Sequence, residues 1–257
     1  MAPVPVEPDD VLERRPSAGS DRVAYGPLAS ADRRFWGELH RLMDGGAKRF
    51  CDVGGGDRPA VQLARIGELD LDYVVFDISQ AELDKAPTGY RLFEGSVLDR
   101  QRVSELLDEG GPFDVVVSRW TAEHMPDGRL FHQMVHDMLR PGGTAVHIFP
   151  TLYAVPFVFN RIFNGGLSAA VLARVQPARR SKFPAYYSWC RGPSERQLNR
   201  LSDLGYSVER YVGFFGHNYY RRIRPLEAAH RRFVRWQLDH PHPLMTSFAL
   251  VVLTRSD

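Results

Sequence analysis

The feature that most constrains the fold is a glycine-rich turn that follows a short apolar stretch. Residues 49–53 are followed directly by Gly54, Gly55 and Gly56, which indicates a buried strand that ends in a turn. Glycine reaches positive φ and lets a ligand approach the backbone closely. We expect Pro59 to open a helix after the turn, because a missing N–H costs nothing at the first helical position. This order of elements predicts a ligand-binding loop.

Two aspartates stand beside this turn in the pattern of a nucleoside site. Asp52 precedes Gly54 by two residues, and Asp77 ends a second apolar stretch about 20 residues further on. A carboxylate at the end of the second strand is placed to accept hydrogen bonds from the hydroxyls of a ribose. Asp77 could instead only cap the next helix. The glycine turn upstream favours the ribose role, so we expect a nucleoside cofactor.

The residues of the turn discriminate between two classes of cofactor. A dinucleotide loop has Gly or Ala at its third small position and points a helix N-terminus at pyrophosphate. This chain has Pro59 at that position, and its Asp52 and Asp57 suit a cationic ligand better. S-adenosylmethionine carries a sulfonium and an amino group but no phosphate. The sequence therefore favours S-adenosylmethionine over NAD.

From residue 48 to about residue 150 the chain resembles the class I S-adenosylmethionine-dependent methyltransferases, of the type 11-like group with small-molecule or sugar acceptors. The motifs that match, in the family's order and spacing, are Cys51–Gly56, Phe76–Ser79, Glu94–Asp99, Phe113–His124 and Leu139–Gly143. The resemblance implies that the residues that contact the cofactor are Asp52, Gly54, Gly55, Gly56, Asp77, Ile78, Ser96, Val97 and Arg119. Arg58 departs from the pattern, because many members have glycine there.

The alternation of predicted strands and helices indicates a doubly wound α/β fold. Residues 30–43 have a helical pattern that Ser30 is expected to cap. Five strands and their helices are predicted between residues 49 and 149, and two more strands at 206–214 and 247–254. The resemblance implies a Rossmann-like methyltransferase fold with a seven-stranded, mostly parallel sheet whose last strand is antiparallel.

One domain, residues 21–257, is predicted, with a tail and an insertion. Residues 1–20 are poor in apolar residues, so we expect them to be disordered. Residues 151–193 form a helical insertion after the fifth strand, and a loop of that length is usually functional. Its apolar residues and arginines leave three interpretations: a structural cap, a lid over the acceptor, or a patch for a membrane surface or acidic glycan.

The composition is that of an ordinary globular protein with a net charge of +2. Its arginines are scattered rather than arranged in a stripe, so we expect no nucleic-acid partner. Cys51 and Cys190 are too few for a disulfide framework, and the sequence shows no signal peptide, which favours the cytoplasm. The expected partners are a small-molecule or sugar acceptor and, through the basic aromatic segments, a membrane surface or glycolipid.

The candidate catalytic residues lie near the ends of predicted strands. The resemblance implies that Glu123 and His124 face the methyl group and the acceptor. A hydroxyl acceptor is a weak acid, and an imidazole can remove its proton near neutral pH. His124 is therefore the first candidate base and His217 the second, with Glu123 as an orienting residue; the alternative is that His124 only bonds to backbone. Trp120 replaces an acid that completes the metal site of some relatives, so we expect no metal.

The sequence thus predicts a methyltransferase that acts on a hydroxyl oxygen of a small molecule, sugar or glycan, in the biosynthesis of a secondary metabolite or a polysaccharide. Two alternatives are a NAD-dependent oxidoreductase, which Pro59 disfavours, and a non-catalytic module that binds a partner or membrane surface through the basic insertion.

Overall fold

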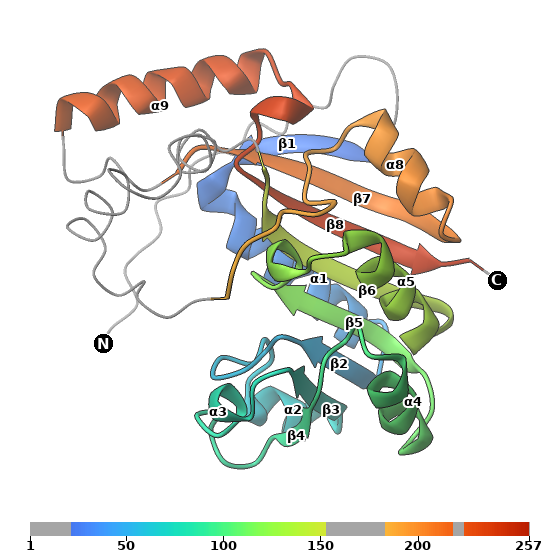
Figure 1. Ribbon diagram of the computed structural model, residues 1–257. Coiled ribbons are helices and arrows are strands. Elements are labelled where there is room, and N and C mark those ends of the chain that lie inside the picture. Colours follow the sequence, from blue (N-terminus) through green and yellow to red (C-terminus); the bar gives the residue numbers. More distant parts are fainter. Residues whose placement is uncertain (1–21, 153–182, 218–223, 257) are drawn as a thin grey trace.

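The computed structural model describes residues 22–152, 183–217 and 224–256. Eight strands form one sheet in the order β1-β7-β8-β6-β5-β2-β3-β4 (Figure 1). The strands are β1 (Val23–Pro27), β2 (Arg49–Val53), β3 (Asp72–Asp77), β4 (Arg91–Glu94), β5 (Phe113–Arg119), β6 (Leu139–Pro150), β7 (Tyr206–Phe215) and β8 (Phe248–Arg255). The predicted tail and residues 153–182 of the predicted insertion lie outside the described residues.

The sheet confirms the predicted fold class and the antiparallel last strand. β8 pairs antiparallel with both β6 and β7, and every other pairing is parallel. The sheet has one strand more than predicted, because β1 adds to its edge and pairs in parallel with β7. Gly26 and Pro27 weaken the strand signal of this segment, but proline is tolerated at a sheet edge.

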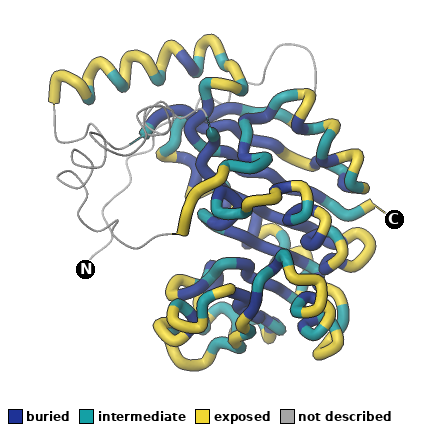
Figure 2. Tube along the Cα trace, in the orientation of Figure 1, coloured by how far each residue is buried: buried dark blue, intermediate teal, exposed yellow. Residues whose placement is uncertain are grey.

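Helices cover both faces of the sheet, as a doubly wound fold requires. One apolar core contains residues of α4, α5 and α8, and a second contains residues of α1 and α3 with partly buried residues of α2. Burial follows the central strands between these layers (Figure 2). The helices are α1 (Ala31–Asp44), α2 (Leu63–Leu69), α3 (Gln80–Leu83), α4 (Arg100–Asp108), α5 (Gly128–Met138), α8 (Glu195–Ser202) and α9 (Arg224–Asp239).

One predicted helix start and one predicted side-chain cap are wrong. α2 begins at Leu63 rather than at Pro59, because side chains accept hydrogen bonds from the N–H groups of the preceding turn. Asp52 accepts the N–H of Ala60, and the hydroxyl of Tyr73 accepts the N–H of Val61. Ser30 precedes α1, but its hydroxyl donates to the carbonyl of Pro27 and does not cap the helix.

The helix α9 was not predicted from the sequence. Its single fully buried residue is Gln237, so no apolar periodicity marks the face that packs on the body. The helix packs against β1 and β7, at one edge of the molecule (Figure 1). Within the three described ranges, no helix is both long enough and apolar enough to cross a membrane.

Candidate functional site

A cavity of about 480 Å³ opens at the carboxyl ends of β2, β3, β4 and β5. Ligands of open α/β sheets bind at this edge. The cavity has two halves. The loops after β2, β3 and β4 form the first half, and the turn after β5 together with residues 183, 184 and 186 forms the second.

The glycine loop closes one side of the first half. Gly54 has a φ of 75°, and its N–H donates to the carbonyl of Phe76 over 2.8 Å. A Cβ added at Gly54 would lie 2.3 Å from the hydroxyl oxygen of Thr121, so no side chain fits. Gly56 has a φ of 41°, and a Cβ there would lie 3.1 Å from the carboxylate of Asp77. The loop, including Gly55, therefore lines the cavity with bare backbone.

Asp52 is buried, forms a hydrogen bond with the backbone that follows this loop, and does not line the cavity. Its side chain is 1% exposed and accepts hydrogen bonds from the N–H of Ala60, over 2.6 Å, and from the hydroxyl of Tyr73, over 2.7 Å. Burial raises the pKa of Asp52 to about 6. The structure thus corrects the expected direct contact with a cofactor: Asp52 is a positioning residue.

Asp77 lies in the wall of the cavity, at the end of β3. One carboxylate oxygen accepts the N–H of Ser79 over 2.9 Å. Burial raises the pKa of Asp77, and hydrogen bonds from the backbone of Ser79 and Gly56 oppose that rise. Ile78, Ser96 and Val97 line the same half. A carboxylate beside a bare glycine loop and two apolar side chains can hold a ribose and a flat base.

Replacing Asp77 by alanine is expected to weaken the binding of S-adenosylhomocysteine by about 1.5–3 kcal/mol, the range for a hydrogen bond to a charged group. Isothermal titration calorimetry measures this loss. Glu94 is the matched control, because it pairs with Asp77 in register on β4 but does not line the cavity. Equal losses for Asp77→Ala and Glu94→Ala would contradict the role of Asp77.

Trp120 begins the second half of the cavity in an unusual backbone conformation. Its φ is 59°, which is rare for a bulky residue and is often found at functional sites. Its N–H donates to the carbonyl of Ile148, and its ring packs edge-on against Phe248 at 5.2 Å. These contacts hold the indole in the cavity wall.

The segment from Phe183 to Tyr187 is attached to the same turn. The N–H groups of Tyr186 and Tyr187 both donate to the carbonyl of Glu123, over 2.8 and 3.0 Å. Phe183, Pro184 and Tyr186 line the cavity. This part of the predicted insertion therefore belongs to the site.

His124 lies in the cavity wall with a defined arrangement of its ring. Its Nδ1 is 3.1 Å from the carbonyl oxygen of Pro184. A carbonyl only accepts hydrogen bonds, so Nδ1 carries the proton of the neutral ring and Nε2 keeps its lone pair. A carboxylate oxygen of Glu123, which is buried and does not line the cavity, lies 3.8 Å from Nε2. His124 can therefore accept a proton at Nε2.

Besides Asp52 and Glu123, two further predicted site residues do not reach the cavity. His217 stacks on His230 of α9 at 4.0 Å, and burial lowers the pKa of His217 to about 4. The guanidinium of Arg119 lies over the ring of Trp36, 5.6 Å from its centroid. Neither residue lines the cavity, so the structure supports neither His217 as a base nor Arg119 as a direct cofactor contact.

Sequence reasoning missed part of the lining. Thr121 and Met125 follow β5, and Glu82 comes from α3. The strand-end motif that contains His124 and the aromatic run that begins at Phe183 were the signals in the sequence for the second half of the cavity. Among residues 22–152, 183–217 and 224–256, no three His, Cys, Asp or Glu side chains are grouped to hold a metal ion.

A family model described as a methyltransferase domain matches residues 28–241. A solved S-adenosylmethionine-dependent methyltransferase from Archaeoglobus fulgidus is 12% identical with a TM-score of 0.52, and the match covers 90% of this chain and 95% of that one. A putative sarcosine dimethylglycine methyltransferase from Galdieria sulphuraria is 14% identical with a TM-score of 0.52, over 89% and 86% of the two chains. These two likenesses concern the fold. No curated protein matches the sequence.

Proposed function

The chain belongs to the methyltransferase domain family, and we propose that it uses S-adenosylmethionine to methylate a hydroxyl oxygen of a neutral small molecule or sugar. The observation that carries the proposal is the position of His124 in the cavity wall, with its Nδ1 hydrogen-bonded to the carbonyl of Pro184. This arrangement supplies a base where a hydroxyl acceptor needs one.

The residues of the first half of the cavity fit the cofactor. The loop at Gly54–Gly56 admits close approach of a ligand, and Asp77 presents a carboxylate at the end of β3. Asp77 would hold the ribose, and Ile78, Ser96 and Val97 would hold the adenine. When bound, S-adenosylmethionine supplies a methyl group on a positively charged sulfur.

The second half of the cavity suits a neutral acceptor. The acids in the described lining are Asp57, Asp77 and Glu82, and all three follow β2 or β3 on the cofactor side. Aromatic side chains, Trp120, Phe183 and Tyr186, dominate the acceptor side. These rings can orient a sugar or phenol ring and exclude water, while Nε2 of His124 takes the proton of its hydroxyl group.

Incubation with S-adenosylmethionine labelled in its methyl group tests the proposal. Phenols and methyl glycosides form the hydroxyl arm of the acceptor panel, and anilines of matched shape form the nitrogen arm. Mass spectrometry should find the label on oxygen in the hydroxyl arm. Labelled nitrogen with no labelled oxygen would overturn the assignment of the acceptor atom.

We also propose that α9 contacts a membrane surface. Phe233 and Trp236 are 44% and 48% exposed, and their rings stack at 5.8 Å. Exposed aromatic rings with arginines nearby favour the interface of an anionic bilayer. The arginines of this helix are Arg224, Arg231, Arg232 and Arg235. Sedimentation with phosphatidylserine vesicles should capture the protein, and a Phe233→Ser, Trp236→Ser variant that is captured equally well would exclude this contact.

A further inference from the structure

The second half of the cavity at the glycine loop has a mainly apolar lining, which narrows the class of acceptor. Its described lining residues are Trp120, Thr121, His124, Met125 and Pro126 after β5, together with Phe183, Pro184 and Tyr186. Phe183 and Tyr186 are 53% and 49% exposed. A ligand in this half would cover these two rings, so the ligand surface that meets them is expected to be apolar.

Two of the aromatic rings are held beside the candidate base. The backbone N–H of Tyr186 donates to the carbonyl of Glu123 over 2.8 Å. The ring of Phe183 lies 6.4 Å from the ring of His124, centroid to centroid, with an interplanar angle of 61°. Aromatic rings that pair gain more free energy than the buried area alone supplies. This arrangement favours a flat aromatic ligand next to His124.

The hydrogen-bonding side chains of this half suit a ligand with a single hydroxyl group. Among its described lining residues, the polar side chains are Thr121, His124 and Tyr186. The hydroxyl of Thr121 donates to the carbonyl of Arg119 over 3.2 Å. Nε2 of His124 keeps its lone pair for a donor on the ligand. A sugar would bring several hydroxyl groups to this half, and each one that is buried without a partner costs free energy.

The acidity of the ligand hydroxyl leads to the same class of acceptor. A phenol has a pKa of about 10, and a sugar hydroxyl is a much weaker acid. An imidazole therefore accepts the proton of a phenol far more readily than the proton of a sugar. A phenol thus fits both the apolar lining and the base.

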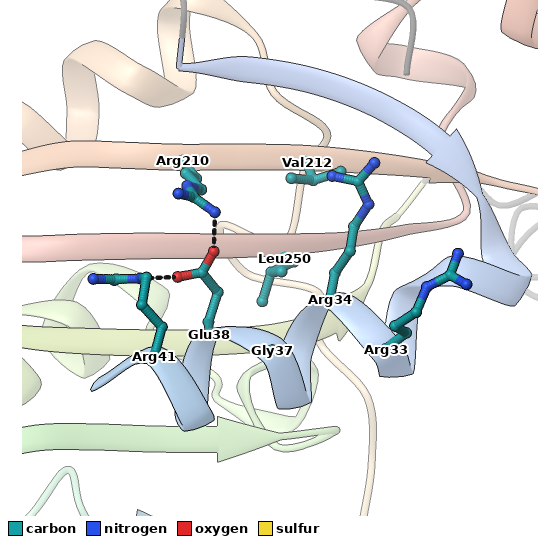
Figure 3. Close-up of a pocket in the computed structure, with 8 residues that line it drawn as sticks. All are labelled: Arg33, Arg34, Gly37, Glu38, Arg41, Arg210, Val212 and Leu250. Carbon is teal, nitrogen blue, oxygen red and sulfur yellow. Dashed lines mark hydrogen bonds and ion pairs between the residues drawn. The ribbon is translucent and has the colours of Figure 1, made fainter. Parts of the chain in front are cut away.

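A second cavity, of about 520 Å³, lies between α1 and the strands β7 and β8 and has a different chemistry (Figure 3). Its described lining contains no aromatic ring and consists of Arg33, Arg34, Gly37, Glu38, Arg41, Arg210, Val212 and Leu250. Glu38 is buried and accepts hydrogen bonds from Arg41 and Arg210. A neutral aromatic ligand is therefore expected at the glycine-loop cavity and not here.

We propose that the acceptor is a phenol, with its ring among Trp120, Phe183 and Tyr186 and its hydroxyl group donating to Nε2 of His124. This inference rests on the proposed function, because it narrows the acceptor of the same site to one class.

Calorimetry on the full chain saturated with S-adenosylhomocysteine tests the inference with three probes of similar size. 4-Methylphenol should bind most tightly. 4-Methylcyclohexanol keeps the shape and the single hydroxyl group but lacks the aromatic ring, so we expect it to bind about 10-fold more weakly. Methyl glucoside adds hydroxyl groups that the described lining does not satisfy, so it should bind roughly 100-fold more weakly than 4-methylphenol.

Variants of Tyr186 test whether the ring forms part of this site. Tyr186→Ala should weaken the binding of 4-methylphenol by about 10-fold, and Tyr186→Phe should restore most of that loss because it restores the ring. Gly37→Leu, which narrows the second cavity, is the control for the location of the probe and should bind 4-methylphenol as the wild type does. All three variants should bind S-adenosylhomocysteine like the wild type, which shows that they are folded.

Turnover of the same probes and of 4-methylaniline with labelled S-adenosylmethionine separates this inference from the proposed function. Label on the oxygen of methyl glucoside at a rate equal to or above that of 4-methylphenol would overturn the phenol and leave methylation of oxygen in place. Label on the aniline nitrogen and on no oxygen would overturn both. The phenol is also overturned if 4-methylphenol does not bind to the wild type, or if Tyr186→Ala binds it unchanged.

Discussion

Replacing His124 by alanine is expected to lower turnover by about 10²–10⁴-fold, the usual contribution of a positioned general base. The reason is geometric. The Nδ1–H of His124 donates a hydrogen bond to the carbonyl of Pro184, so Nε2 is the nitrogen of this cavity-lining residue that keeps its lone pair. S-adenosylhomocysteine affinity should be unchanged, because we propose that the glycine loop and Asp77 hold the cofactor. Initial rates with labelled S-adenosylmethionine measure the effect.

Two further variants test whether the loss of turnover is specific to His124 and to its basicity. His217→Ala should keep wild-type turnover, because His217 packs on His230 outside the cavity. His124→Gln should retain part of the positioning but not the basicity. Near wild-type turnover for His124→Ala would show that the reaction proceeds by alignment of its groups alone.

Replacing His132 by leucine is expected to stabilise the protein by about 3 kcal/mol more at pH 4.5 than at pH 7.5. His132 of α5 is 3% exposed, and its ring lies 5.4 Å from that of His147. Among the described residues, Nδ1 of His132 has no hydrogen-bond partner. Burial lowers the pKa of His132 to about 4, from an ordinary value of 6.5.

The direction of this pH effect on stability follows from the number of protons that the folded and unfolded chains bind. Between pH 6.5 and pH 4 the unfolded chain protonates this imidazole and the folded chain does not, so the free energy of unfolding falls as the pH falls. Asp52 acts in the opposite direction, because burial raises its pKa to about 6. The pH profile of the wild type alone therefore mixes the two effects, and the difference between wild type and variant separates them.

Urea unfolding at both pH values measures this difference. His40→Gln, at an exposed position of α1, is the matched control for the removal of a histidine side chain from a helix. A His132→Leu variant whose stability relative to wild type is the same at pH 4.5 and pH 7.5 would show that His132 is not held neutral in the folded protein.

The sequence predicted the elements whose signals are local. The bounds of β2 and the end of β3 were correct, because a glycine follows β2 directly and β3 ends in an aspartate. β1 and α9 were missed because their stability comes from partners distant in sequence. β1 depends on pairing with β7, and α9 packs through the stacked rings of His217 and His230.

The distinction between local signals and contacts that are distant in sequence also applies to the candidate site. The glycine loop and Asp77 were placed correctly at the cavity, because strand ends and turns are visible in a short window. The bond from His124 to Pro184 joins residues 60 positions apart, and the bond from Tyr73 to Asp52 joins residues 21 positions apart. Such pairs carry no periodic signal, so the tautomer of His124 and the supporting role of Asp52 needed the structure.

Calorimetric titration of the wild-type chain with S-adenosylhomocysteine and, separately, with NAD tests the assignment of the glycine-loop cavity most directly. We expect one site for S-adenosylhomocysteine and no binding of NAD, because the acids of that cavity suit a cofactor without phosphate. Tight binding of NAD with no binding of S-adenosylhomocysteine would contradict the assignment.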